Sequence, residues 1–152
     1  MKILFIGSIG VITRHRSEGQ RFFVDGLGLP LERAEGGDFL FSQNLKGSRY
    51  FGVWPLTEAA RVCFGKESWP AGRPVPQMFV EYEVGSPGSV TKAAAELRSK
   101  GYTLLHPPRT DPWSQRVARL QTGDGVIIGI SYVPWMHRRV NRRPKRHSRS
   151  RR

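Results

Sequence analysis

The chain has 152 residues, of which 38% are hydrophobic, 24% charged and 11% aromatic, a composition typical of a soluble globular protein with one domain or two small fused units. No apolar run approaches the roughly 18 residues of a membrane span, and the first residues, MKILFIGSIGVIT, alternate like a strand and lack a signal-peptide cleavage site. A single cysteine, Cys63, excludes an internal disulfide. We therefore expect a cytoplasmic protein without membrane contact, in which Cys63 is a small buried hydrophobe.

The predicted elements occur in the same order twice. In chain order they are a strand at 3–13, a helix at 14–28, strands within 29–56, a Pro-rich loop at 67–77, a strand at 78–84, a helix at 89–101, and strands at 102–108, 114–125 and 126–133. We expect Ser89 to cap the second helix and Gly101 to end it. The pattern predicts two βαβββ modules, at about 2–66 and 76–135, with a linker at 67–75.

The net charge of +13 is concentrated at the end of the chain. Residues 136–152 hold nine Lys or Arg and no acid, which leaves 16 bases against 12 acids in the remainder. With almost no apolar surface to bury, we expect this basic tail to be disordered. It either attracts nucleic acid or another polyanion non-specifically, or serves only as a solubilising extension.

The repeated pattern resembles the vicinal oxygen chelate superfamily, which includes glyoxalase I, extradiol dioxygenases, and fosfomycin and bleomycin resistance proteins. The stretches RFFVDGLGL, FGVWPL and TDPWSQRVARLQTGDGVIIGISY carry this resemblance, which covers about residues 2–135. It implies an α+β fold in which the two modules form a half-open barrel around one cavity. It also implies a homodimer, to which we expect the apolar strand VIIGISYVPW and Trp69 to contribute surface.

Metal-dependent members of this superfamily carry ligands on the first and last strands of each module. The resemblance places Ser8, Phe79 and Gly129 at three of these positions, and the fourth falls near Val53 or Trp54. Such residues are not the imidazole and carboxylate donors that a divalent metal requires. We therefore expect no metal and no cofactor, and interpret Gly129 as a vacated ligand position that would tolerate glutamate.

Alternation along the strand of Phe79 places Glu81 and Glu83 on the same face, toward the cavity. For Glu81 two roles stay open: ligand recognition or general-base chemistry, or an ion pair with an arginine such as Arg116 or Arg119. For Glu83 we favour an ion pair at the wet rim.

Aromatic side chains suit a planar ligand, although packing in the core or at a dimer contact is the alternative for each tryptophan. We expect Trp113 to form a cavity wall with Gln115 beside it, and we expect His15 and His106 at the surface. The candidate ligand-binding residues are Ser8, Trp54, Phe79, Glu81, Glu83, Trp113, Gln115 and Gly129.

Three functions fit these features, and no catalytic residue is assigned. The first is a metal-free protein of the bleomycin-resistance type that sequesters a small, partly aromatic molecule, as in antibiotic resistance. The second is an enzyme, a metal-dependent lyase or dioxygenase with other ligands, for example Glu81 with His15. The third is a polyanion-binding module that acts through residues 136–152.

Overall fold

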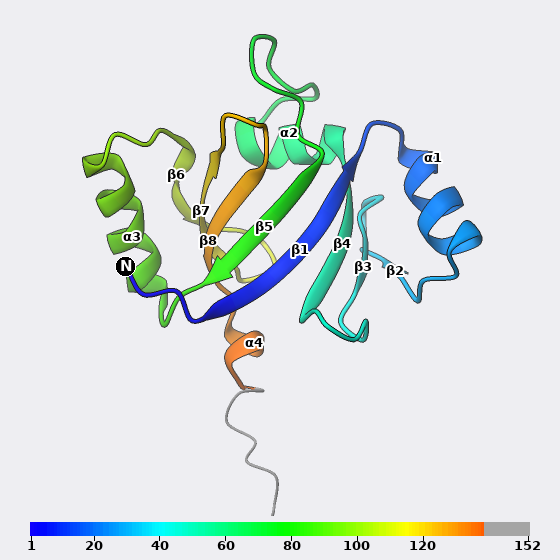
Figure 1. Cartoon of the computed structure of the whole chain (residues 1–152), viewed down its shortest axis with the longest axis horizontal. Helices are drawn as coiled ribbons and strands as arrows, with labels where there is room; N and C mark the ends of the chain where they lie inside the picture. The colour runs from blue at the N-terminus through cyan, green and yellow to red at the C-terminus, as the bar shows by residue number, and fades with distance from the viewer. Residues whose placement is uncertain (139–152) are drawn as a thin grey trace, which may run out of the picture.

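The computed structural model describes residues 1–138, in which eight strands form a single sheet (Figure 1). Residues 139–152, most of the predicted basic tail, lie outside the described part. The elements are β1 (Phe5–Thr13), α1 (Arg16–Glu18), the π-helical segment η1 (Gly19–Gly26), β2 (Glu32–Arg33), β3 (Leu40–Ser42), β4 (Tyr50–Pro55), α2 (Leu56–Phe64), β5 (Met78–Glu83), α3 (Pro87–Ser99), β6 (Leu104–Thr110), β7 (Arg116–Gln121), β8 (Ile127–Tyr132) and α4 (Pro134–Arg138).

The strand order is β2-β3-β4-β1-β5-β8-β7-β6, so each half of the sheet repeats the other. In each half the first strand pairs in parallel with the last, β1 with β4 and β5 with β8. The halves meet where β1 runs antiparallel to β5, at the centre of the sheet. The α+β fold expected from the sequence is confirmed, with the βαβββ order present twice.

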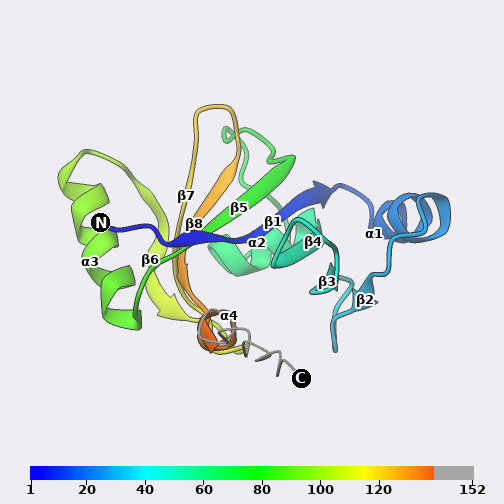
Figure 2. The same ribbon diagram turned by 60° about the horizontal axis from the view of Figure 1, so that its bottom comes forward.

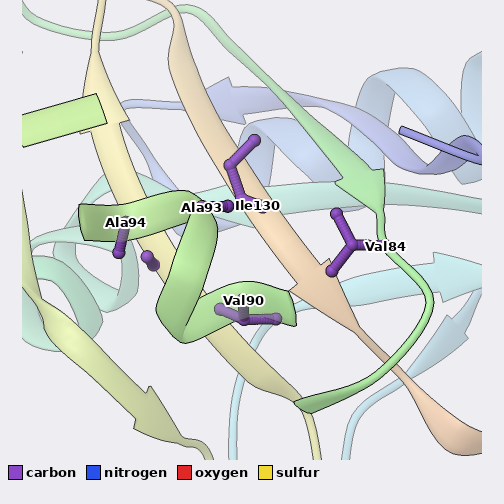
Figure 3. Packing of buried hydrophobic residues seen from close by; sticks show 6 residues of the cluster. Val84, Val90, Ala93, Ala94 and Ile130 are labelled. Carbon is purple, nitrogen blue, oxygen red and sulfur yellow. The ribbon is translucent and has the colours of Figure 1, made fainter. Parts of the chain in front are cut away.

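Helix α3 covers one face of the second half and builds its core. It begins at Pro87, and the hydroxyl of Ser86, rather than Ser89 as expected, accepts a hydrogen bond from the Ser89 amide at 3.1 Å. Small and β-branched residues let the helix lie close to the sheet. They pack with strand residues in one cluster (Figure 3): Val84, Val90, Ala93, Ala94, Ala118 and Ile130.

Helix α2 was not predicted, and it lies on the opposite face of the sheet from α3. It follows Pro55 and ends at Gly65, whose φ of 66° is the left-handed conformation that favours glycine at a helix end. Its buried residues Ala59 and Cys63 pack against a second cluster, which contains Trp54, Phe79 and Ile127. Cys63 is buried as expected, and burial raises its pKa to about 11.

The C-terminal helix α4 packs against the lower end of the sheet (Figures 1 and 2). Met136 is only 2% exposed, and the Arg49 guanidinium donates a hydrogen bond to its carbonyl at 2.9 Å. Residues 136–138 therefore belong to a packed helix and not to the tail that was expected to start at residue 136.

Two further expectations concern surfaces. The strand VIIGISYVPW is not a free edge, because β8 lies between β5 and β7, and the Trp69 ring packs on Phe64. The homodimer stays a prediction. Within residues 1–138, no helix combines the length and the apolar character needed to cross a membrane.

Candidate functional site

A row of side chains crosses the sheet on the face that α2 partly covers. The register pairs Ser8 of β1 with Tyr50 of β4 on one side and with Glu81 of β5 on the other. The row continues from Glu81 through Gly129 of β8 to Arg119 of β7. Residues aligned in this way point to the same side of a sheet, so polar groups from both modules meet on one floor. The positions beside Ser8 are thus Tyr50 and Glu81, not Trp54 and Phe79.

Gly129 has a specific role in this row. Neighbouring strands lie about 4.8 Å apart, so Glu81 and Arg119 are separated by the whole width of β8. Their side chains meet over Gly129, with the Arg119 Nη2 3.1 Å from the Glu81 Oε1. A Cβ at residue 129 would lie 2.8 Å from the Glu81 Cγ, which is too close. The space beside Gly129 is therefore occupied by Glu81, which corrects the expectation that a glutamate would fit there.

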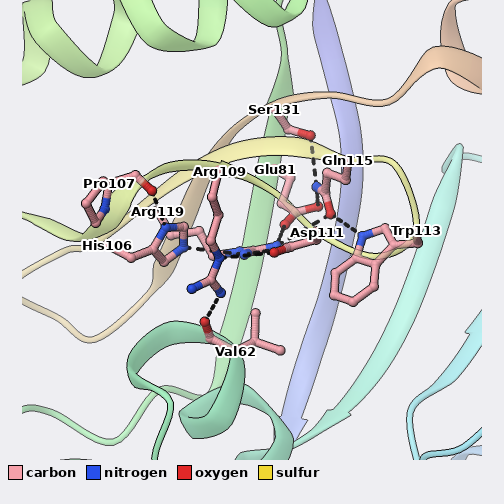
Figure 4. A network of polar contacts seen from close by, with 10 residues as sticks. All are labelled: Val62, Glu81, His106, Pro107, Arg109, Asp111, Trp113, Gln115, Arg119 and Ser131. Carbon is pink, nitrogen blue, oxygen red and sulfur yellow. Dashed lines mark hydrogen bonds and ion pairs between the residues drawn. The ribbon is translucent and has the colours of Figure 1, made fainter.

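The buried guanidinium of Arg119 holds this floor together (Figure 4). It is 1% exposed and donates to Glu81 and, at 3.0 Å, to the carboxylate of Asp111. Gln115 adds to the network by donating to Glu81 at 2.7 Å and to the hydroxyl of Ser131 at 2.8 Å. Of the two arginines suggested as partners of Glu81, Arg119 fills the role. Arg116 instead contacts Thr91.

The network extends from the floor to helix α2. Asp111 also accepts a hydrogen bond from Arg109, whose other nitrogen donates to the carbonyl of Val62 on α2. His106 is 7% exposed and contacts the Pro107 carbonyl and Arg119, so it is not the surface residue that was expected. Burial, together with the positive charge of Arg119, lowers the pKa of His106 to about 4, so the imidazole is neutral and carries its proton on Nδ1.

A cavity of about 560 Å³ opens above this floor. Seven of the 21 residues that line it are aromatic, and aromatic side chains with a few polar groups are usual in a site for a small organic molecule. Phe39, Phe41 and Tyr50 stack with centroids 5.4–6.3 Å apart and planes within 14° of one another. The Phe79 ring occupies space that a side chain at Gly10 or Gly52 would need. The other aromatic wall residues are Trp54, Trp113 and Trp135.

Six of the eight candidate ligand-binding residues line this one cavity: Ser8, Trp54, Phe79, Glu81, Trp113 and Gln115. Trp113 is 52% exposed at its mouth, and its indole N–H donates to the Gln115 oxygen at 2.6 Å. Gly129 is not among the lining residues, because Glu81 covers it.

Glu83 is also absent from the cavity lining, and it does not lie at a wet rim. It is 1% exposed, and its Oε2 accepts hydrogen bonds from the Val133 amide at 2.7 Å and from His137 at 2.9 Å. The His137 ring is also stacked on Tyr132. Glu83 thus fastens α4, whose Trp135 and Met136 form one wall of the cavity.

The floor is a poor match for a metal ion. Its oxygen donors are the hydroxyls of Ser8 and Tyr50 and the carboxylate of Glu81, which already binds Arg119 and Gln115. Burial, and then the charge of Glu81, raise the pKa of Tyr50 and so keep its phenol protonated. A fixed guanidinium beside a single carboxylate opposes a divalent cation. Across residues 1–138, no group of three or more His, Cys, Asp or Glu side chains could hold a metal.

Several cavity residues were not found from the sequence. Glu58 and Arg61 are on α2, which was not predicted, and Phe39 and Phe41 come from the segment around the short strand β3. The alternation of Phe39 and Phe41 is a signal for two aromatic side chains on the same face. Trp135 was predicted to close the last strand, and the sequence left open whether it faces the cavity, the core or a dimer contact.

The sequence profile of the Glyoxalase/Bleomycin resistance protein/Dioxygenase superfamily matches residues 6–130. A superfamily member from Vibrio splendidus 12B01 is 17% identical over 84% of this chain and 97% of that chain, with a TM-score of 0.52. A variant of methylmalonyl-CoA epimerase from Streptomyces coelicolor, in complex with 2-nitronate-propionyl-CoA, is 16% identical over 88% and 96%, with a TM-score of 0.55. Identities this low relate the folds alone. No curated protein matches the chain.

Proposed function

The chain belongs to the glyoxalase/bleomycin resistance protein/dioxygenase superfamily, and we propose that it binds a small, partly aromatic molecule in its cavity without a metal ion. The observation that carries this proposal is that the carboxylate of Glu81 is already hydrogen-bonded within the protein. It is the acidic side chain on the floor, and Arg119 and Gln115 already engage both of its oxygens. A neutralised floor under aromatic walls favours stacking and hydrogen bonding of an organic ligand.

The same geometry supports sequestration of the ligand over its chemical conversion. Glu81 is hydrogen-bonded on both oxygens, so it is poorly placed to take a proton from a ligand, and the neighbouring phenol of Tyr50 holds its own proton. The polar groups of the floor are suited to orienting a ligand by hydrogen bonds. The protein therefore holds the molecule and releases it unchanged.

The alternative function, a metal-dependent lyase or dioxygenase, would need donors from other residues. The pair considered from the sequence was Glu81 with His15. His15 is exposed before α1 and does not line the cavity, so the geometry does not favour this pair. Polyanion binding through the basic tail depends on residues outside the described part and remains a separate prediction.

A melting experiment with aromatic compounds, divalent metals and a chelator tests the proposal. We expect a bound compound at one hundred times its dissociation constant to add about 2.7 kcal/mol to the free energy of unfolding, with the same gain in the chelator. The compound should be recovered chemically unchanged. Stoichiometric metal in the purified protein, with ligand binding lost in the chelator, would overturn the metal-free proposal.

A further inference from the structure

Some charged side chains that line the cavity form ion pairs within this chain, and others do not. Two guanidinium groups reach its lining, and each has a carboxylate of its own: Arg119 binds Glu81 and Asp111, and Arg61 binds Glu67 with two nitrogens. Both arginines that line the cavity are therefore already paired with carboxylates of this chain.

Glu58, unlike these arginines, lines the cavity without an ion pair among the described residues. It projects from α2 into the cavity lining and is half-buried. Its Oε1 accepts a hydrogen bond from the Asp38 amide at 2.6 Å, yet within residues 1–138 Glu58 forms no ion pair. The two arginines that approach from the neighbouring segments, Arg16 and Arg33, are both bound to the carboxylate of Asp38. Within the described residues the charges of Arg61, Arg16 and Arg33 act on Glu58 without forming an ion pair with it, and burial raises the pKa of its carboxyl group.

Aromatic rings line the cavity together with this carboxylate. The ring of Phe39 follows Asp38 directly in the chain, and Trp54 packs edge-on against it with centroids 6.3 Å apart. Both rings line the same cavity as Glu58. An electron-rich ring face and a carboxylate both attract positive charge, and each is worth more when partly shielded from water.

We propose that the ligand of this cavity is a planar aromatic cation, whose positive charge is held at Glu58 against the ring of Phe39. This inference rests on the proposed function and adds the charge of the ligand to it. The exposed carboxylate of Glu35, which also lines the cavity, extends the attraction to its mouth. The site thereby selects a cation even though the chain as a whole has a net charge of +13.

Two probes of nearly identical shape test the charge. 10-Methylacridinium is a permanent cation, and acridine at pH 8 is its neutral counterpart. We expect the wild-type protein to bind the cation more tightly than acridine in fluorescence titrations. Glu58→Gln retains an oxygen to accept the Asp38 hydrogen bond and should fold normally, which its melting curve will check. It should weaken binding of 10-methylacridinium by about tenfold and leave acridine unchanged.

The matched control is Glu96→Gln. It makes the same change in net charge on α3, on the face of the sheet away from the cavity, and should alter neither affinity. If Glu58→Gln leaves the preference for the cation intact, or the wild type shows no preference, the assignment of charge is wrong while the aromatic site stands. If neither probe binds the wild type and no aromatic compound raises its melting temperature, the proposed function itself fails.

Discussion

Arg119 and Glu81 form a buried ion pair across an intervening strand, with 3.1 Å between the guanidinium nitrogen and the carboxylate oxygen. The pair is possible because Gly129, the residue between them in the register, has no side chain. A glycine in the middle of a strand weakens the strand itself. The ion pair between Glu81 and Arg119 explains why a glycine nevertheless occupies residue 129.

Gly129→Ala should destabilise the protein by about 1–3 kcal/mol, the usual cost of overpacking. The new Cβ would lie 2.8 Å from the Glu81 Cγ and push the carboxylate away from Arg119. Denaturant unfolding measures the loss. Gly123→Ala is the control, because a Cβ at residue 123 meets nothing within 4 Å. Equal stabilities of the two variants would contradict the role assigned to Gly129.

Arg119→Met should cost about 3–5 kcal/mol, because it leaves Glu81 and Asp111 buried without their guanidinium partner. Protonation relieves an unpaired buried carboxylate, so the deficit relative to wild type should shrink as the pH falls. Unfolding curves at several pH values measure this. Arg116→Met, which removes only a contact with Thr91, should change stability little. A deficit that did not depend on pH would point to lost packing instead.

Protonation of His106 should lower the stability of the folded protein in mild acid. Its pKa in the folded protein, about 4, lies below the ordinary value of 6.5, so folding favours the neutral imidazole. The stabilisation is fully present above pH 6.5 and disappears as the pH falls from about 6.5 to about 4. His106→Gln should remove this part of the pH dependence, and His15→Gln, at an exposed residue, should not. Parallel stability profiles for wild type and His106→Gln would refute the assignment.

Trp113→Ala should weaken binding of an aromatic probe about tenfold, the upper range for the loss of one stacking partner. The stability should change by less than about 0.5 kcal/mol, because the side chain is 52% exposed. Trp113→Phe should restore most of the affinity. Tyr102→Ala, at a ring that is 55% exposed and outside the cavity lining, controls for general surface effects. Unaltered binding by Trp113→Ala would remove this residue from the site.

The sequence predicted the part of the site that depends on strand alternation. Because side chains on one strand point alternately to two faces, Glu81 could be placed beside Phe79, and both line the cavity. The resemblance supplied the pairing of two modules. Strand alternation does not give the register between strands, and the interpretation of Gly129 as a vacated ligand position rested on the resemblance alone. Its true relation to Glu81 and Arg119 appears only when three strands are aligned.

The rest of the site depends on packing that local patterns do not encode. Glu58 was missed because the short helix that carries it directly follows a strand without a polar cap. Glu83 was expected at a rim because it ends its strand, whereas α4 folds over it and brings His137 to its carboxylate. His106 was likewise expected at the surface, whereas it is buried beside Arg119. Each of these positions is decided by elements that are distant in the sequence.

The central pairing of β1 with β5 has a consequence for how occupancy would affect folding. Ser8 belongs to the first module and Glu81 to the second, and they are neighbours only through this antiparallel pair. A molecule that rests on both residues would contact both halves of the sheet. Its binding free energy would then be lost when either half opens, so a bound ligand would link the two halves into one cooperative unit and slow the opening of each.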